Sequence, residues 1–275
     1  MPELPEVETV VRGLRQAIIG ETLSKVVCRY PKINLDNPKN WCRTMKERQF
    51  LAVRRRGKNI LIDLSGGVTL WVHLKMTGHF YLASSDTPVG RHDLVLFFLS
   101  DPNRQLRYQD TRRFGRLRLF PTEIVMAQKG LADLGPEPLE IKKADFLSLM
   151  QNNRRMIKPA LLDQRFLAGI GNIYADEALF RAGIHPRQRT CEISIRKLNR
   201  LYAAMREILI TAIDNMGTTV DTYAGINGEF GGFQSYLRVY GREGQACFRC
   251  GRAIRREVIG SRSAHFCPRC QSPGT

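Results

Sequence analysis

Four cysteines near the C-terminus have the spacing of a metal site. They form the pattern Cys247-x2-Cys250-x16-Cys267-x2-Cys270, in which two CxxC knuckles supply four thiolates within tetrahedral reach of one ion. Zn²⁺ is the ion that such thiolates usually bind, and four protein ligands leave no open position for a substrate. We therefore expect one structural zinc ion. Chance spacing and a redox pair are the alternatives that the pattern leaves open.

A second candidate for chemistry stands at the N-terminus, where Pro2 follows the initiator methionine and Glu3 comes next. If Met1 is removed, Pro2 is a secondary amine with a pKa of roughly 8, so a useful fraction is neutral at pH 7. Its attack on an aldehydic sugar carbon would give an iminium ion, which cannot become neutral by losing a proton from nitrogen and acts as an electron sink. Glu3 could serve as a general acid. A Pro-Glu pair that simply opens a helix is the alternative.

Two further segments have features of phosphate-binding sites. Gly169-Ile170-Gly171-Asn172 precedes a predicted helix, where glycines let the backbone approach a ligand and the first amides attract an anion. Asn172 can cap this helix, and Lys158 adds positive charge at the start of the preceding one. Arg262 lies between the two cysteine knuckles, in a segment (245–275) with six arginines and one acid. An ordinary turn and a solvated arginine remain the alternatives.

The charge of the whole chain points to a polyanionic partner. The sequence has 43 Lys and Arg against 26 Asp and Glu, a formal net charge of +17. Such a chain repels itself unless a polyanion neutralises it, which favours nucleic acid over a merely soluble basic protein. No segment has the amphipathic, aromatic-faced pattern of a membrane-surface helix.

The length of 275 residues suits two ordinary domains or one with appendages. The longest apolar run is too short to cross a bilayer, and the acidic start is unlike a signal peptide, so an intracellular location is expected. Cysteines should be reduced there, which favours metal over disulfides. The three that have no CxxC partner, Cys28, Cys42 and Cys191, are predicted to be buried, inert thiols.

The elements that would position these residues follow from periodicity. A first helix runs from Pro5 to Gly20, with Val7, Val10 and Leu14 on one face. β-like sequence follows as far as Phe120. The predicted strands are 50–53, 59–64, 68–74, 78–82, 94–99, 106–109 and 117–120. This pattern predicts a β-sandwich with one helix at its start.

The second half is predicted to be helical. A Gly-Pro linker at 134–138 separates it from the sandwich. Helices are expected at 144–152, from Pro159, at 172–182 and at about 194–216, with Gly217 as the cap of the last. A Gly-rich stretch at 224–233 then leads to the cysteine-rich end. The predicted fold is therefore α+β and multidomain.

Several motifs in this order resemble bacterial formamidopyrimidine-DNA glycosylase, the 8-oxoguanine repair family. They are Met1-Pro2-Glu3-Leu4-Pro5-Glu6-Val7-Glu8, Arg56-Gly57-Lys58, His73-Leu74-Lys75-Met76-Thr77-Gly78, Asp110-Thr111-Arg112-Arg113-Phe114-Gly115, 169–175 and the four-Cys finger. The resemblance implies a catalytic β-sandwich domain (1–133), a helix–two-turn–helix DNA-binding domain (134–222), and a lesion-capping loop with a zinc finger (223–275). It also implies a monomer, with double-stranded DNA in the cleft between its two lobes.

The resemblance implies a role for each matching residue. Pro2 would attack C1′ of the damaged nucleotide and expel an oxidised purine, Glu3 would protonate the sugar ring oxygen, and β- and δ-elimination would cut the abasic strand. Lys58 matches a lysine that contacts phosphate near the lesion. Further phosphate contacts are implied for His73, Lys158, Asn172 and Arg262.

Base flipping explains a second group of matching residues. A glycosylase must extrude its target nucleotide, which leaves a hole in the duplex. Met76, Arg112 and Phe114 match the residues that fill it, with Arg112 donating hydrogen bonds to the orphaned cytosine. Burial of Met76 and Phe114 in a core is the alternative. The Gly-rich stretch matches a mobile loop over the extruded base, and a flexible linker has the same composition.

Two other functions share part of this pattern. One is endonuclease VIII, a sister glycosylase for oxidised pyrimidines; Leu4 and the intact Arg112-Arg113-Phe114-Gly115 loop favour the purine enzyme. The other is a zinc-dependent binder of damaged DNA without chemistry, which only Pro2 and Glu3 distinguish from the enzyme. Retention of Met1 would favour the binder, because a blocked Pro2 cannot attack.

Overall fold

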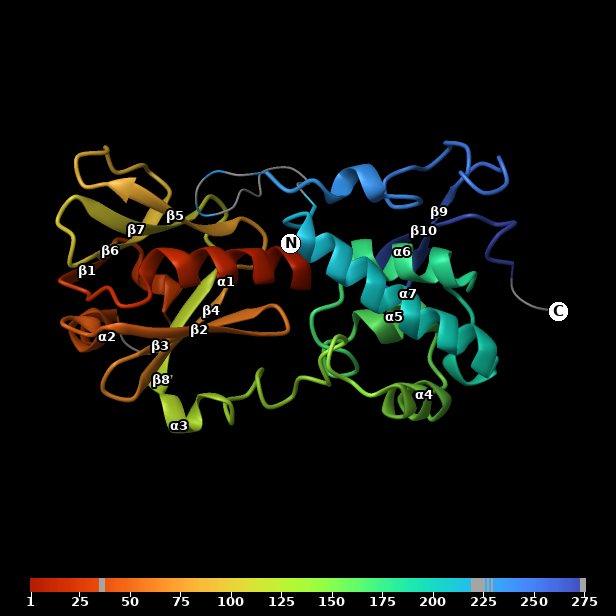
Figure 1. Cartoon of the computed structure of the whole chain (residues 1–275), viewed down its shortest axis with the longest axis horizontal. Coiled ribbons are helices and arrows are strands. Elements are labelled where there is room, and N and C mark those ends of the chain that lie inside the picture. Colours follow the sequence, from red (N-terminus) through yellow and green to blue (C-terminus); the bar gives the residue numbers. More distant parts are fainter. Residues whose placement is uncertain (35–37, 219–225, 227, 229, 273–275) are drawn as a thin grey trace. The chain divides into compact units, whose positions relative to one another are not determined.

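The computed structural model describes residues 1–34, 38–218, 226, 228 and 230–272, and the chain divides into two compact units (Figure 1). Unit 1 comprises Met1–Ala132 and Asn215–Gly232, and unit 2 comprises Asp133–Asp214 and Phe233–Thr275. The division into 1–133, 134–222 and 223–275 stays a prediction. The two units divide the chain differently, because the described residues between 215 and 232 belong to the N-terminal unit.

Unit 1 is built on two four-stranded antiparallel sheets, with strand orders β1-β6-β7-β5 and β2-β3-β4-β8. Residues from both sheets share one apolar core, so the predicted sandwich is confirmed. The strands are β1 (Lys25–Cys28), β2 (Phe50–Arg56), β3 (Asn59–Leu64), β4 (Val68–His73), β5 (Gly78–Ser84), β6 (Asp93–Phe98), β7 (Arg104–Asp110) and β8 (Arg116–Pro121).

The predicted first helix is α1 (Leu4–Ile18), and its apolar stripe lies in the core of the sandwich. Val7, Val11 and Leu14 are completely buried there. The Arg15 guanidinium donates to the Val53 carbonyl at 2.7 Å, which joins the helix to β2. This packing fixes the N-terminal end of α1, and with it the two residues that precede the helix.

The helix predicted at the start of the sandwich is present as α1, but the sequence did not predict two further helices in this unit. A second helix, α2 (Pro38–Met45), follows β1 and a 3-10 turn, η1 (Pro31–Ile33), and a short helix, α3 (Thr122–Val125), follows β8. Trp41 and Met45 are both buried in the core. These two are four residues apart on one helical face, a signal too short to stand out within the strand-like sequence around it.

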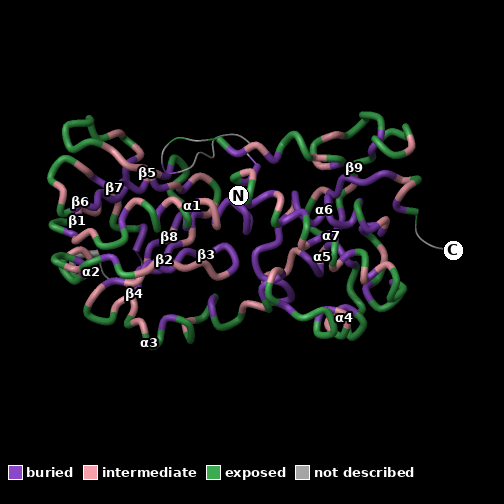
Figure 2. The backbone as a smooth tube through the Cα atoms, viewed as in Figure 1, coloured by how far each residue is buried: buried purple, intermediate pink, exposed green. Residues whose placement is uncertain are grey.

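Unit 2 confirms the predicted helical half. Its elements are α4 (Lys143–Gln151), α5 (Ile157–Leu162), α6 (Asn172–Ala182), η2 (Thr190–Glu192), α7 (Ile195–Asp214), η3 (Phe233–Tyr236), β9 (Arg255–Ile259) and β10 (Arg262–Phe266). Figure 2 shows the buried segments of both units among exposed turns and helix surfaces. In the described ranges, no helix is long and apolar enough to cross a membrane.

Candidate active site and zinc centre

The N-terminal residues lie at the start of α1. Pro2 and Glu3 are buried, whereas Met1 before them is 47% exposed. The Glu3 backbone N–H donates to Glu6 Oε2 at 2.8 Å, which satisfies an amide that no helical carbonyl can reach. The fold therefore holds the predicted nucleophile and its neighbouring acid on a rigid helix end.

Glu6 is a positioning residue that sequence reasoning missed. Its second oxygen, Oε1, accepts the Thr218 backbone N–H at 2.8 Å, so one buried carboxylate joins the N-terminus to the chain beyond α7. Gly217 lies against it: a Cβ on Gly217 would come within 2.6 Å of Oε1. The sequence did contain a signal for Glu6: an acid three residues after Glu3 has the spacing of a capping box.

The chain after the Gly-rich segment lies next to the chain before it. Gly232 N–H donates to the Asn215 carbonyl at 2.8 Å, and a Cβ on Gly231 would come within 2.3 Å of the Gly217 carbonyl oxygen. The two ends of the segment are thus held together beside Glu6. This segment is predicted to lie over the extruded base, and four of its residues, 224, 225, 227 and 229, lie outside the described residues.

Lys58 and His73 come together through the β2–β3 turn and the β3–β4 pairing. Gly57 has a φ of +56°, which suits the tight turn that presents Lys58, and Asn59 pairs with His73 across the sheet. Lys58 is 5% exposed. His73 Nδ1 accepts the Lys75 backbone N–H at 3.0 Å. Burial, with the charges of Lys75 and Lys58, lowers the pKa of His73 to about 3, so this imidazole is neutral.

The neutral state of His73 predicts a pH-dependent stability. An unfolded histidine has a pKa of about 6.5, so between pH 6.5 and 3 the unfolded chain binds a proton that the folded chain does not. The neutral His73 therefore lowers the free energy of unfolding increasingly as the pH falls below 6.5, by about 2 kcal/mol at pH 5. Urea unfolding at pH 7.5 and pH 5 should show that His73→Gln loses about 2 kcal/mol less on acidification than the native chain. Equal losses in both would contradict this assignment.

Met76, Arg112 and Phe114 form an exposed group on two loops of unit 1. Met76 is 43% and Phe114 49% exposed, so burial in the core is wrong for both. The Arg112 guanidinium lies 4.8 Å from the Phe114 ring centroid, within cation–π distance. Apolar side chains held out into solvent beside an arginine suit insertion between base steps.

Asp110, which sequence reasoning missed, fixes both loops. This completely buried carboxylate accepts the Thr77 hydroxyl, the Arg112 N–H at 3.1 Å and the Gly115 N–H at 2.7 Å. Thr77 Oγ1 in turn accepts the Arg112 N–H at 3.1 Å. The loop after Met76 and the loop carrying Arg112 are thus tied together at their bases. No periodic or motif signal marks such a contact in advance.

In unit 2 a buried ion pair links α6 to the finger hairpin. Lys158, predicted to contact phosphate, is completely buried, and its ammonium donates to Asp176 Oδ1 at 2.5 Å and to the Ser263 carbonyl at 2.6 Å. Asp176 Oδ2 accepts the His265 backbone N–H at 2.9 Å. Here the structure differs from the expectation, because the Lys158 ammonium faces the interior of the unit. Arg262, at the start of β10, is exposed.

Asn172 stands at the start of α6, as predicted, but as the first helical residue instead of the cap. Gly171 is the N-cap, and Gly169 has a φ of +90°. Gln164 holds this turn: its Oε1 accepts the Gly169 N–H and its Nε2 donates to the Ile170 carbonyl, both at 2.9 Å. Asn172 Oδ1 is buried, and within the described part of the chain it has no hydrogen-bond partner.

The four predicted cysteines meet at one point. Their sulfur atoms all lie within 4.8 Å of one another, with Cys247 to Cys270 at 3.9 Å and Cys250 to Cys267 at 3.5 Å. A tetrahedron with Zn–S bonds of about 2.3 Å needs sulfur atoms about 3.8 Å apart, so the residues fit the ion. The chain has one structural zinc site, formed by these thiolates.

The other cysteines differ from the prediction in part. Cys28 and Cys42 are half-buried; burial raises the pKa of both thiols, that of Cys42 to about 11, which agrees with inert thiols. Cys191 is exposed, so its predicted burial was wrong. It lies within the short 3-10 turn η2, and such a turn has no periodic pattern from which exposure could be inferred.

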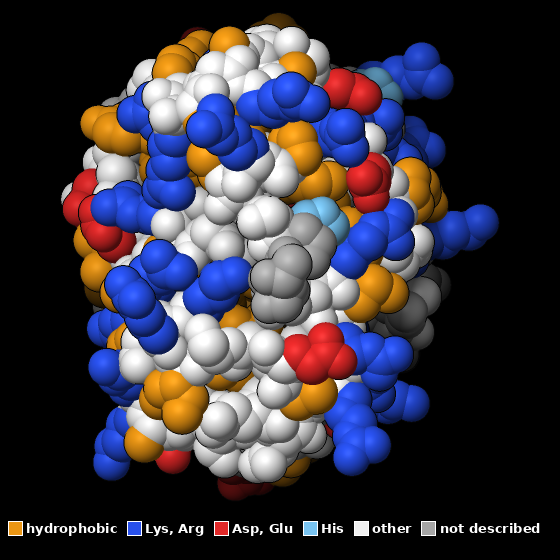
Figure 3. Space-filling model, turned by 90° about the vertical axis from the view of Figure 1, so that its right-hand side faces the viewer, with side chains coloured by type: hydrophobic (Ala, Val, Ile, Leu, Met, Phe, Trp, Pro, Cys, Tyr) orange, Lys and Arg blue, Asp and Glu red, His pale blue; other side chains and the backbone are white. Residues whose placement is uncertain are grey.

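Three family models cover most of the chain. The formamidopyrimidine-DNA glycosylase N-terminal domain matches residues 1–117, its H2TH domain matches 134–224, and the zinc finger found in FPG and IleRS matches 244–273. Lys and Arg side chains also outnumber Asp and Glu on the face that Figure 3 shows. Fold, charge and site together define the class: a DNA glycosylase of base-excision repair with a structural zinc finger.

Whole-chain comparisons narrow the class. Formamidopyrimidine-DNA glycosylases of Pelotomaculum thermopropionicum and Heliobacterium modesticaldum are each 44% identical, covering 98% of this chain and 99% and 100% of theirs. A Lactococcus lactis FPG variant in complex with DNA containing Fapy-dG superposes with a TM-score of 0.93 at 34% identity, covering 99% of this chain and all of that one. The chain belongs to the formamidopyrimidine-DNA glycosylase family.

Proposed function

We propose that this chain excises oxidised purines, 8-oxoguanine and formamidopyrimidines, from duplex DNA and then cleaves the abasic strand. The observation that carries this proposal is the Pro2-Glu3 pair at the buried start of α1, in the same unit as the exposed Met76 and Phe114. The chemistry needs an amine at C1′, and the exposed loops supply groups that could hold the duplex open. We place this activity in the bacterial cytoplasm, on nucleoid DNA.

The proposed reaction begins with attack of the Pro2 nitrogen on C1′ of the flipped nucleotide. The C1′–N-glycosidic bond breaks, and the base leaves with the bonding electrons and takes up the proton that the Pro2 nitrogen loses on forming its new bond. Glu3 protonates the ring oxygen as the sugar opens, which leaves an iminium ion at C1′. The iminium draws electrons from the sugar, so loss of a C2′ proton expels the 3′-phosphate and a further proton loss expels the 5′-phosphate. Hydrolysis of the iminium frees Pro2.

DNA contacts in this proposal fall into two groups. Lys58 and His73 bind phosphate near the lesion, with His73 as a neutral hydrogen-bonding group because its pKa is about 3. Asn172 and Arg262 bind phosphate from unit 2. Lys158 is assigned a different part: through Asp176 and the Ser263 carbonyl it holds the hairpin that presents Arg262.

Substrate choice tests the proposal against its rival. The native chain should release 8-oxoguanine opposite C at least 10-fold faster than thymine glycol opposite A, measured as single-turnover strand cleavage of labelled duplexes. Arg112→Ala should lower the preference for C over A opposite 8-oxoguanine, because the guanidinium no longer reads the orphaned base. The exposed Arg196→Ala on α7 serves as the matched control.

The opposite preference would assign the chain to the endonuclease VIII reaction. A specific observation keeps that second candidate in the test: the Lactococcus lactis FPG has also been solved in complex with DNA containing an oxidised pyrimidine, at 34% identity to this chain. Binding of both duplexes without release of either base would instead indicate a damage-binding protein.

A further inference from the structure

Unit 2 has a cavity of about 330 Å³ that the repair chemistry does not use. It is lined by α6, α7, η3 and the first cysteine knuckle. Phe180 and Phe233 are almost completely buried in its floor, and Ile208 is 6% exposed beside them. Tyr236 and Phe248 stand at the rim, 44% and 63% exposed. An apolar floor with exposed aromatic rings at its edge is typical of a pocket that binds a ligand or a partner protein.

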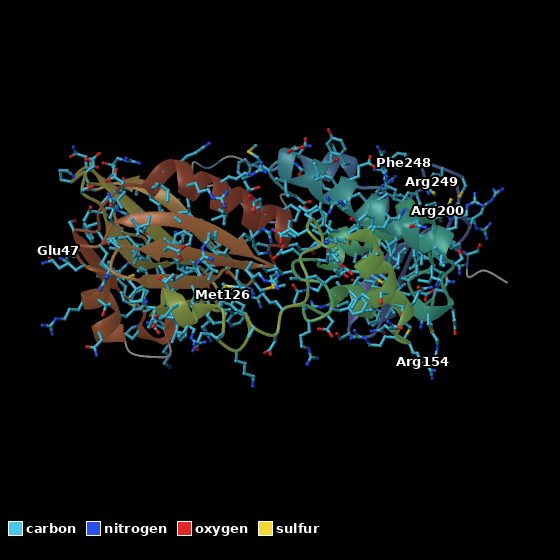
Figure 4. The ribbon with its side chains drawn as sticks, turned by 60° about the horizontal axis from the view of Figure 1, so that its bottom comes forward. Glu47, Met126, Arg154, Arg200, Phe248 and Arg249 are labelled. Atoms are coloured by element: carbon cyan, nitrogen blue, oxygen red, sulfur yellow. The ribbon has the colours of Figure 1, made fainter. Side chains whose placement is uncertain are left out.

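We call this cavity the knuckle pocket. Three arginines lie at its rim. Arg238 and Arg242 lie over the Phe248 ring, at 4.9 and 3.8 Å from its centroid, and Arg249 lies over the Phe180 ring at 4.5 Å. No carboxylate among the described residues lies within salt-bridge distance of these three guanidinium groups. Figure 4 labels Phe248 and Arg249 at the edge of unit 2. The pocket therefore combines an apolar floor with unneutralised positive charge.

Two acids lie close by and both are already occupied. Glu177 lines the pocket, but its carboxylate is buried and accepts the backbone N–H groups of residues 238, 239 and 240 at 2.9 to 3.0 Å. Glu207 pairs with Arg181 on the wall. Neither acid offers an open partner to the rim arginines. Arg242 already donates to the Gln245 side chain and to the carbonyls of residues 238 and 246, and Arg249 donates to the carbonyls of residues 180 and 181. These neutral acceptors hold the two guanidinium groups in place without neutralising their charge, which an incoming anion would do.

A second hollow along α7 shares one lining residue, Thr211, with the knuckle pocket. That hollow, of about 540 Å³, is lined by residues of α4 and α7, including Tyr202, Arg206 and Ile210. Thr211 lines both hollows, and Ile210 is 47% exposed. A ligand longer than the pocket would cross Thr211 onto this face of α7, which suits an extended segment.

Its place in unit 2 separates the pocket from the proposed phosphate contacts. Phe180 is eight residues beyond Asn172 on α6, about 12 Å along the helix at 1.5 Å per residue. Arg262 lies on the β9–β10 hairpin, which does not line the pocket. A duplex backbone also has no apolar group with which to fill the floor formed by Phe180 and Phe233.

We propose that the knuckle pocket binds an acidic peptide segment of a partner protein. An aromatic or large aliphatic side chain of the segment lies on the floor beside Phe180 and Phe233. Its carboxylates pair with Arg238, Arg242 and Arg249. Charge complementarity and the apolar floor together select this partner. DNA would satisfy the positive charge alone, and any apolar surface would satisfy the floor alone, but an acidic segment with an apolar side chain satisfies both.

Fluorescence anisotropy with the zinc-loaded full chain tests the proposal. The probe is a fluorescein-labelled peptide of six alternating Asp and Glu residues followed by Leu-Phe, and the control peptide has Ser-Ser at its end. We expect the probe to bind with a Kd of about 10 μM at low salt and the control at least 10-fold more weakly. Arg238→Glu should weaken probe binding at least 10-fold, and Phe248→Ser at least fivefold.

Matched variants separate a specific site from general charge and from misfolding. Arg200→Glu makes the same charge change on the exposed face of α7, outside the pocket lining, and should change the Kd less than twofold. Phe248→Tyr should retain binding within threefold. Zinc content, and affinity for a duplex with an abasic site, should stay native in all these variants.

Three results would overturn the proposal. One is that the probe and the Ser-ended peptide bind equally. Another is that Arg200→Glu weakens binding as much as Arg238→Glu does, which would indicate general charge. The third is that Arg238→Glu and Phe248→Ser weaken duplex binding more than fivefold, which would assign the pocket to DNA.

Discussion

Replacing Pro2 with glycine should reduce excision of 8-oxoguanine at least 100-fold. Such a loss corresponds to about 2.7 kcal/mol in the activation free energy. The physical reason is that the secondary amine of Pro2 gives an iminium ion that stays charged, whereas the primary amine of glycine gives an imine that can lose its proton. The fold should be unaffected, because α1 begins at Leu4 and its apolar face is unchanged. Single-turnover excision and borohydride trapping of the covalent adduct on an 8-oxoguanine:C duplex measure the effect.

Controls for this result lie in the same helix end. Pro5→Ala changes the same residue type within α1 and should keep excision within threefold of native. Glu3→Gln should retain affinity for abasic DNA and lose most of the excision, because the amine remains while the proton donor is gone. Mass spectrometry must show that Met1 is absent. An undiminished adduct in Pro2→Gly, mapped to a lysine, would show that Pro2 is not the nucleophile.

Loss of the zinc ion should abolish specific DNA binding while leaving unit 1 folded. The apolar cluster around the finger contains only five buried residues, two of which are zinc-binding cysteines. The finger therefore depends on the ion, whose binding contributes about 10–16 kcal/mol in isolated finger peptides. Once it unfolds, the hairpin loses two contacts, that of the Ser263 carbonyl with Lys158 and that of the His265 N–H with Asp176, and Arg262 is no longer held.

The measurement is DNA affinity together with zinc content for Cys267→Ser and for chelator-treated protein. We expect at least a 100-fold loss of affinity for a duplex with an abasic site. The circular dichroism of the β-sandwich should be preserved, because its core lies in unit 1. Cys191→Ser is the matched control: this thiol is exposed and outside the zinc cluster, so zinc content and affinity should stay native. Native affinity in a zinc-free Cys267→Ser protein would refute a structural role.

The sequence by itself determined the features that are local. Periodicity predicted α1 and strands β2 to β8 within a few residues, and it predicted the bounds of α6 as observed, Asn172–Ala182, because capping and hydrophobic alternation act over a single element. Strands β1, β9 and β10 were not predicted. The CxxC spacing gave the zinc ligands because a knuckle is a local structure. Helix α2 was not predicted because only Trp41 and Met45 mark its buried face.

Tertiary structure alone decided which distant residues meet and which face water. Asp110 ties the loop of Met76 to that of Arg112, and Glu6 joins the N-terminus to Thr218, by hydrogen bonds that no pattern along the chain encodes. The sequence also did not determine which apolar side chains are exposed. A methionine or phenylalanine can lie in a core or stand out into solvent, depending on what packs against it, and only the folded chain shows that Met76 and Phe114 are exposed. Lys158 shows the converse, because a lysine predicted to contact phosphate is completely buried once Asp176 is brought to its ammonium.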